Sequence, residues 1–270
     1  MKIAALVVWY NPYNVGVGAV ANIETYSKYF ESVIVVDNSK EDNRELLKAI
    51  GNAVYFPNYE NVGIAKALNI GCQKALEEGY EWVLTMDQDS FWSNSKQLEH
   101  YIQFCEKLYL SNSKNISFAP RVVGLKEKIQ EQEADKFSYI KIMLTSGNIL
   151  NLKAWLDVGK FNEQLFIDDV DHEICYRLRQ KGYNLISIRN CYMNHEIGFH
   201  GVHYGVRMYY ITRNCLYMKK HWPEFWVEYE KNLYLRDLFI DKIKHLNIKD
   251  MYFMIKGYIH AKKGIYGKYK

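Results

Sequence analysis

Two aspartates separated by one residue follow directly after an apolar run. The run is Trp82 to Met86, and the acids are Asp87 and Asp89. If the run is a β-strand, its two-residue period places both carboxylates on one side of the strand end, where they repel each other unless a cation lies between them. Mg2+ or Mn2+ would suit these oxygen ligands and would also bind a substrate's phosphates. The alternative is a solvated turn in which an aspartate caps the next helix.

A second group of acids precedes a predicted helix that runs to Gln180. Asp168, Asp169, Asp171 and Glu173 lie within six residues of one another. Crowded negative charges make a carboxylate a better proton acceptor, as a general base requires. Acids at this position also cap a helix and complement its dipole, and we expect at least one of the four to do so.

Strands that alternate with helices through residue 89 predict the framework for the first pair of acids. Apolar runs predict buried strands, and the segments between them predict helices; a clean i, i+3, i+4 stripe starts at Ile64. Such βαβ units imply an α/β fold with a mostly parallel, Rossmann-like sheet flanked by helices. The predicted strands are Ile3–Trp9, Ser32–Val36, Ala53–Phe56 and Trp82–Met86, and the predicted helices are Asn22–Phe30, Glu41–Ile50 and Ile64–Leu76.

Polar residues follow several of these strands. Tyr10 and Asn11 follow the first, Asp37 the second, and Asp87, Gln88 and Asp89 the fourth. Ligands of parallel sheets bind at the carboxyl ends of the strands, so these residues predict a nucleotide site. The turn Asn61-Val62-Gly63 opens a helix whose N-terminus would face the same ligand. Neither a G-x-G-x-x-G fingerprint nor a P-loop follows the first strand.

Composition limits the class of protein. Of the 270 residues, 49% are hydrophobic, which fits a globular protein, and the five cysteines show no C-x-x-C spacing, which favours a reducing compartment. No apolar run has the roughly 18 residues that a membrane span requires, so we expect a cytoplasmic protein. Residues 215–270 hold 12 Lys/Arg, six Asp/Glu and 12 aromatic residues. This basic, aromatic region indicates contact with an anionic membrane surface or nucleic acid, or a solvated helical face over an aromatic core.

Eight short segments stand out by their order and spacing. They are V-V-W-Y-N-P, V-V-D-N-S, N-V-G-I-A-K-A-L-N-I-G, M-D-Q-D-S, T-S-G-N (145–148), L-F-I-D-D-V-D-H-E-I-C-Y-R-L-R-Q-K-G-Y (165–183), N-H-E-I-G (194–198) and Y-Y-I-T-R-N (209–214). Together they resemble the family 2 inverting glycosyltransferases of GT-A fold. The resemblance covers about residues 3–215 and is closest to bacterial rhamnosyltransferase-like members that build surface polysaccharides. It implies a nucleotide-binding half (about 1–95), an acceptor half (about 96–214) and a helical C-terminal extension (215–270).

The resemblance implies roles for the metal and the base. Asp89 would bind Mn2+ or Mg2+, Asp87 the ribose or a metal-bound water, and His195 the metal or the diphosphate, with His200 and His203 as alternates. Aligned on the downstream Arg177, Asp171 falls at the family's catalytic aspartate, and Asp169 is the second candidate.

It also implies a donor-binding set. Tyr10 and Asp37 would meet the base or ribose. Arg213, with Asn214 and Arg207 beside it, would neutralise the departing diphosphate. Ser146 and Gly147 would let the sugar approach the backbone. The other members of this set are Asn11, Asn61, Gly63, Lys66, Asp87 and Gln88.

The expected function is inverting transfer of a sugar, with dTDP-L-rhamnose as the best single donor, to an oligosaccharide or polyprenyl-diphosphate-linked acceptor. Peripheral association with the inner face of the membrane would follow, with no nucleic-acid partner; the oligomeric state is left open, a dimer included. One alternative is a sugar-1-phosphate nucleotidyltransferase, but Asn11 to Gly18 lacks the basic residue of its glycine-rich loop. The other alternative is a non-catalytic, membrane-associated binding protein.

Overall fold

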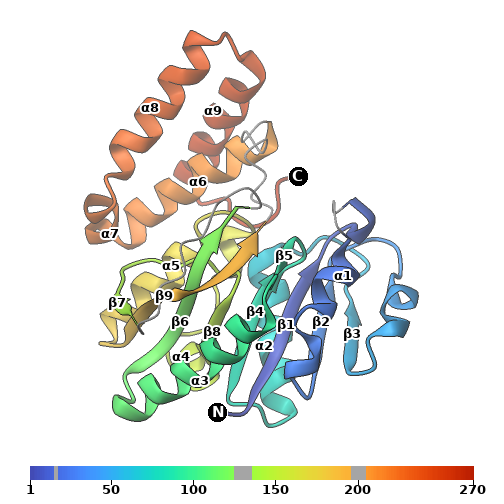
Figure 1. Cartoon of the computed structure of the whole chain (residues 1–270). Coiled ribbons are helices and arrows are strands. Elements are labelled where there is room, and N and C mark those ends of the chain that lie inside the picture. Colours follow the sequence, from blue (N-terminus) through green and yellow to red (C-terminus); the bar gives the residue numbers. More distant parts are fainter. Residues whose placement is uncertain (15–17, 125–135, 196–204) are drawn as a thin grey trace.

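The computed structural model describes residues 1–14, 18–124, 136–195 and 205–270. Its strands form one mixed sheet in the order β3-β2-β1-β4-β8-β6-β9-β5, with β7 paired to β9. Helices cover both faces, and a helical C-terminal region stands at one end of the sheet (Figure 1). The expected α/β architecture is confirmed.

Four parallel strands form the N-terminal half of the sheet. Their registers pair Trp9 with Asp37 and Val8 with Asp87, so the polar residues that follow them gather at one edge. Along the first strand, alternate side chains enter two separate cores, with Leu6 in one and Val7 in the other. The strands are β1 (Ile3–Trp9), β2 (Val33–Asp37), β3 (Ala53–Pro57) and β4 (Trp82–Asp87).

Two of the three helices predicted in this half are shorter or tighter than expected. Only α2 (Ile64–Glu77) is a long α-helix. The segment predicted at 41–50 is a 3-10 helix, η3 (Arg44–Ala49), in which only Leu47 is buried. Without an apolar stripe, tertiary packing does not stabilise an α-helix there. The segment predicted at 22–30 divides into α1 (Ala19–Glu24) and the 3-10 helix η2 (Ser27–Tyr29); a further 3-10 turn, η1, spans Pro12–Asn14.

The second half adds antiparallel pairing. β8 lies antiparallel to β4 and β6, while β9 runs parallel to β6 and extends to His195. The strands are β5 (Ser90–Phe91), β6 (Asn115–Val123), β7 (Phe137–Tyr139), β8 (Asn148–Asn151) and β9 (Asn184–His195). The helical elements are α3 (Ser95–Ser111), α4 (Leu152–Asp157), the 3-10 helix η4 (Glu163–Leu165) and α5 (Val170–Gln180).

The C-terminal region is helical. It comprises α6 (Val206–His221), α7 (Pro223–Glu228), α8 (Lys231–Lys244) and α9 (Ile248–Lys263). Residue 214, where we expected a boundary, lies inside α6. The α8–α9 hairpin (residues 231–263) extends away from the sheet (Figure 1). None of the helices in the described residues combines the length and the apolar character that crossing a bilayer requires.

Candidate active site

Two adjoining cavities lie at the carboxyl edge of the parallel strands. The larger has a volume of about 730 Å3, and the smaller has about 240 Å3. Ile64, Asp87 and Ile167 line both cavities, so the two spaces adjoin at these residues.

Asp87, Asp89 and His195 form a group with the composition of a metal site. One ligand atom from each lies within 4.8 Å of the others. Asp87 ends β4, and the pairing of β5 with β9 places Ser90 opposite His195, which brings the imidazole to the aspartates. Carboxylate oxygens with one imidazole nitrogen suit Mn2+, and the carboxylates also suit Mg2+. The three predicted metal ligands are therefore together.

A chain of hydrogen bonds fixes this group from behind. The backbone N–H of Asp87 donates to Ser146 Oγ (3.0 Å), Ser146 Oγ donates to Ser90 Oγ (2.7 Å), and Ser90 Oγ lies 2.6 Å from His195 Nδ1. A partner on one ring nitrogen orients a ligating histidine. Ser146 is buried, as is Gly147, whose added Cβ would lie 2.9 Å from Met193 Sδ. Neither residue, both predicted to let the sugar approach the backbone, lines either cavity: Ser146 bonds to Asp87 and Ser90, and Gly147 packs against Met193.

The electrostatics of the group favour a bound cation. The pKa of Asp87 is raised to about 6: burial is the largest cause, His195 lowers the pKa, and the charges of Asp89 and Asp171 raise it. A carboxylate that is costly to ionise next to two more carboxylates is stabilised in its charged form by a divalent ion.

The smaller cavity holds part of the predicted donor set. Tyr10, Asn61, Gly63 and Gln88 line it beside the two aspartates. The Gln88 side chain exchanges two hydrogen bonds with the Tyr10 backbone (2.8 and 3.1 Å), which joins the ends of β1 and β4. Asn61 Oδ1 accepts from the Gly63 N–H (3.0 Å). Asn11, at the same edge, donates its N–H to Ser39 Oγ (2.8 Å).

Asp37 and Lys66, both predicted donor residues, line neither cavity. Asp37 is 1% exposed, and its carboxylate accepts from Ser39, Asn43 and Tyr55, so it organises the loop after β2 rather than opening to a ligand. Its neighbour Asn38 lines the smaller cavity instead. Lys66 is on the exposed side of α2.

The acidic loop, residues 166–171, lines the larger cavity and has an unusual backbone. Phe166, Asp168 and Asp169 all have positive φ (66°, 62° and 58°). The N–H of Ile167 donates to Leu165 O (2.8 Å), which makes Phe166 the centre of a rare, strained γ-turn. Conformations of this kind persist only where neighbouring structure holds them, and they concentrate at functional sites.

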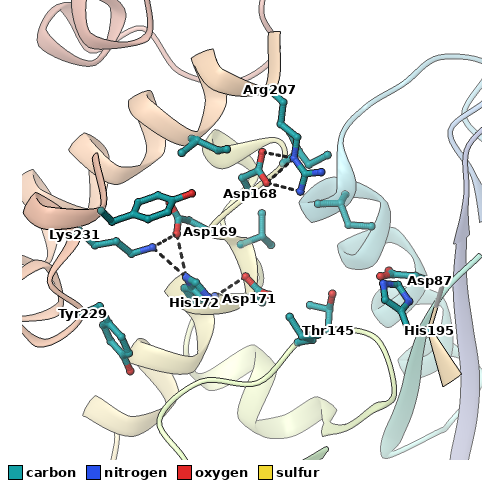
Figure 2. A pocket seen from close by; sticks show the side chains of 16 residues that line it. Asp87, Thr145, Asp168, Asp169, Asp171, His172, His195, Arg207, Tyr229 and Lys231 are labelled. Carbon is teal, nitrogen blue, oxygen red and sulfur yellow. Dashed lines mark hydrogen bonds and ion pairs between the residues drawn. The ribbon is translucent and has the colours of Figure 1, made fainter. Parts of the chain in front are cut away.

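The four predicted acids differ in their partners. Asp169 accepts from Lys231 Nζ (2.7 Å) and contacts His172 Nδ1 (3.0 Å). Burial alone would raise the pKa of Asp169, but His172 and Lys231 outweigh it and lower that pKa to about 2. Glu173 pairs with Arg177 (2.5 Å) away from the larger cavity. Asp171 is half-buried and lines that cavity with Asp87 and His195 (Figure 2).

Arg213 is not placed to meet a diphosphate. Its guanidinium is fully buried and donates to the carbonyls of Gln164 (3.0 Å), Leu165 (2.7 Å) and Gly267. Asn214 Nδ2 donates to the carbonyls of Leu165, Ile167 and Asp168 (3.0, 2.6 and 2.8 Å). The pair therefore holds the acidic loop in its strained conformation.

Arg207 is the arginine at the cavity. Its Nε and Nη2 both donate to Asp168 Oδ1 (3.0 and 2.8 Å) at the cavity wall (Figure 2). His200 and His203, the alternates for the third metal ligand, lie outside the described residues.

The sequence analysis did not select several of the residues that line the larger cavity. His172 lies in the acidic segment, and Thr145 begins the T-S-G-N segment, but neither was selected. Tyr229, Lys231 and Tyr234 come from the region that composition assigned to a membrane surface or a solvated face. Only the packing of the α7–α8 junction against the acidic loop reveals them.

Comparisons with known proteins agree with this geometry. A family model described as Glycosyl transferase family 2 matches residues 16–144. Over 245 residues the chain is 31% identical to the dTDP-rhamnosyl transferase RfbF of Shigella flexneri, with 82% of each chain covered.

Solved structures share the fold at low identity. The mannosyltransferase PcManGT from Pyrobaculum calidifontis, in complex with GDP-Man and Mn2+, matches with a TM-score of 0.62 and 12% identity over 96% of this chain and 86% of its own. S. aureus TarS 1–349 with UDP-GlcNAc gives 0.57 and 14% over 81% and 67%, and GalNAc-T7 with UDP, GalNAc and Mn2+ gives 0.55 and 13% over 72% and 44%. The expected GT-A fold and family are confirmed: the chain belongs to glycosyl transferase family 2.

Proposed function

We propose that the protein transfers a sugar from a nucleotide-diphosphate donor to an acceptor hydroxyl with inversion. The supporting observation is that Asp87, His195 and Asp171 line one cavity, while Asp89, which completes the metal-ligand group, lines the adjoining cavity. An inverting reaction needs a stabilised leaving group and a base on opposite faces of the sugar ring, and this pairing can supply both.

Each residue then has a defined task. Asp89, Asp87 and His195 would hold Mn2+ or Mg2+, which would stabilise charge on the departing diphosphate. Asp171 accepts the proton of the acceptor hydroxyl as its oxygen bonds to the anomeric carbon and the bond from that carbon to the diphosphate breaks. Tyr10, Asn61 and Gln88 bind the nucleoside in the smaller cavity. Asp169 is too tightly paired with Lys231 to serve as the base.

The donor is proposed as dTDP-L-rhamnose. The support is the 31% identity to a dTDP-rhamnosyl transferase. The acceptor is proposed as a saccharide carried on a polyprenyl diphosphate, used in surface polysaccharide synthesis.

A lipid-linked acceptor fits the surface of the α8–α9 hairpin. Leu246 and Ile248, at its tip, are 81% and 77% exposed, and residues 231–263 carry eight Lys/Arg against three Asp/Glu. Exposed apolar side chains among cations are suited to an anionic bilayer surface. We propose peripheral attachment at the inner face of the membrane through this hairpin.

The test is nucleotide-sugar binding and turnover with and without Mn2+. Wild type should bind and slowly hydrolyse dTDP-L-rhamnose only with the metal, and Asp89→Ala should abolish both. Asp42→Ala, an exposed acid outside both cavities, is the matched control. Equal donor binding with and without metal would contradict the metal site. Formation of pyrophosphate from dTTP and a sugar 1-phosphate, supplied in place of the donor, would indicate a nucleotidyltransferase, and no nucleotide binding would favour a non-catalytic protein.

A further inference from the structure

The end of the larger cavity farthest from the metal-ligand group is built by the junction of α7 and α8. Tyr229, Lys231 and Tyr234, here called the far wall, line it. Figure 2 shows Tyr229 and Lys231 on one side, Asp87 and His195 on the other, and Asp171 between them. The C-terminal region therefore closes the active-site cavity rather than only covering the fold.

In-line displacement determines which substrate meets the far wall. The leaving diphosphate lies with Asp87 and His195, so the attacking hydroxyl must approach from the opposite side of the transferred sugar. Asp171 has to contact that hydroxyl. An acceptor bound there extends past Asp171 toward the far wall.

The cations around the far wall are already neutralised. Lys231 is paired with Asp169 (2.7 Å), and Arg207 is paired with Asp168 (2.8 Å). His172 contacts the same Asp169 carboxylate (3.0 Å). An acceptor phosphate would have to break one of these ion pairs to gain a cation, so the wall favours a neutral group.

The far wall offers aromatic faces instead. Tyr234 is 42% exposed. Tyr229 lies nearly parallel to the His172 ring, at 8°, with its hydroxyl bonded to Lys141 O (3.3 Å). Aromatic faces are electron-rich, and the C–H groups on one face of a pyranose pack well against them. Leu144 adds an apolar contact on the same cavity.

The wall and the base loop are fixed to each other. Lys231 is buried at the first turn of α8, and its bond to Asp169 links that turn directly to the acidic loop. A sugar stacked on the tyrosines would thus be held at a constant distance from Asp171, as a well-oriented attack requires.

We propose that Tyr229 and Tyr234 form the acceptor subsite, that this subsite takes a neutral sugar ring, and that the two tyrosines determine acceptor specificity. The proposal rests on the proposed glycosyl transfer and places the acceptor's reacting residue, not its lipid or phosphate, at the far wall.

The experiment uses the full chain, Mn2+, dTDP-L-rhamnose and a panel of neutral p-nitrophenyl glycosides as probe acceptors, with dTDP release and glycoside product as readouts. At least one glycoside should accelerate dTDP release over water. Tyr234→Ala and Tyr229→Leu should each raise the KM for that glycoside at least about tenfold, while the KM for the donor stays constant. Tyr229→Phe keeps the ring and should retain the acceptor KM. Tyr252→Ala, on the exposed side of α9, is the matched control.

Three results would overturn the subsite. One is an acceptor KM that is unchanged in both ring-removing variants, and another is loss of affinity in Tyr229→Phe equal to that in Tyr229→Leu. The third is donor hydrolysis without acceleration by any neutral glycoside. Failure of the proposed function itself looks different, because the wild type would then show no metal-dependent use of the nucleotide sugar at all.

Discussion

Replacing Asn214 with alanine should separate the support of the acidic loop from the chemistry of its acids. Asn214 is fully buried, and its amide donates to three carbonyls between Leu165 and Asp168. Its Oδ1 accepts from Arg213 at 3.0 and 2.8 Å. The substitution removes these bonds and leaves the strained γ-turn at Phe166 without its main restraint.

The cost can be worked out from the bonds. Two amide hydrogens shared among three carbonyls contribute about 1–3 kcal/mol, and an acceptor lost by a buried guanidinium costs about 1.5–3 kcal/mol. We expect Asn214→Ala to lower the free energy of unfolding by about 3–5 kcal/mol, a large share of a typical stability. The protein should stay folded at low temperature, where activity is measured.

Displacement of Asp171 by relaxation of the loop should then lower kcat about a hundredfold. Donor binding should change little, because the metal-ligand group lies on β4, β5 and β9. The assays are urea unfolding, Mn2+-dependent donor binding and turnover.

Asn115→Ala is the matched control. Asn115 is buried and makes two hydrogen bonds of 2.9 Å, to Leu108 O and from Asn184, at the opposite edge of the sheet. It should lose stability and keep kcat. If Asn214→Ala had the same kcat as Asn115→Ala, or lost less than about 1 kcal/mol, our account of the loop would be refuted.

Three further predictions follow from single contacts. Gly63 has φ 89° and ψ 160°, and an added Cβ would lie 2.6 Å from the Phe166 ring. Gly63→Ala should therefore lower the free energy of unfolding, measured in urea, by more than about 2 kcal/mol and weaken donor binding. Gly51→Ala, where an added Cβ would meet open space, should do neither. Asp169 has a pKa of about 2 in the folded protein against about 3.9 unfolded, so its carboxylate contributes about 2–3 kcal/mol of stability above pH 4, and this contribution is lost as the pH falls toward 2. The difference in unfolding free energy between wild type and Asp169→Asn, measured by urea unfolding, should therefore narrow over that range, and a constant difference would contradict this pKa. In a flotation assay at low salt, wild type should bind anionic but not neutral vesicles, and the double variant Leu246→Ser/Ile248→Ser should bind neither. Leu110, on α3, is 79% exposed, and Leu110→Ser should bind as wild type does. Loss of vesicle binding in Leu110→Ser would contradict a role for the hairpin.

The sequence predicts the parts of the fold that depend on local pattern. The four N-terminal strands and α2 were found because continuous apolar runs and a helical stripe are properties of single segments. The antiparallel insertion of β8 between β4 and β6 could not be found in this way, since the order of strands in a sheet depends on pairing between distant segments. The short 3-10 helix after β2 was predicted as a longer helix because a charged segment contains no sign that only Leu47 will be buried.

Arg213 and Arg207 also differ in a way that depends on contacts between distant segments and not on local pattern. Both are cations in the same stretch of sequence, and the predicted diphosphate contact went to Arg213. In the structure Arg213 is fully buried and holds the acidic loop, whereas Arg207, six positions earlier on the same helix, is half-exposed at the cavity. On a helix these positions face different directions. The sequence does not show which face of α6 packs against the acidic loop and which face lines the cavity.

The acids of the 168–173 segment show why a role cannot be read from a residue type. Composition makes the four equivalent, yet three of them meet different cations at different distances along the chain: Asp168 meets Arg207, Asp169 meets Lys231, and Glu173 meets Arg177. Lys231 lies 62 residues from Asp169 along the chain, so no local sequence pattern predicts their ion pair. Ion pairs with these cations occupy three of the carboxylates and leave Asp171 as the half-buried one that lines the cavity with Asp87 and His195. In the proposed mechanism the C-terminal region therefore favours Asp171 as the base, because Lys231 pairs with Asp169, and the same turn of helix positions the tyrosines of the far wall.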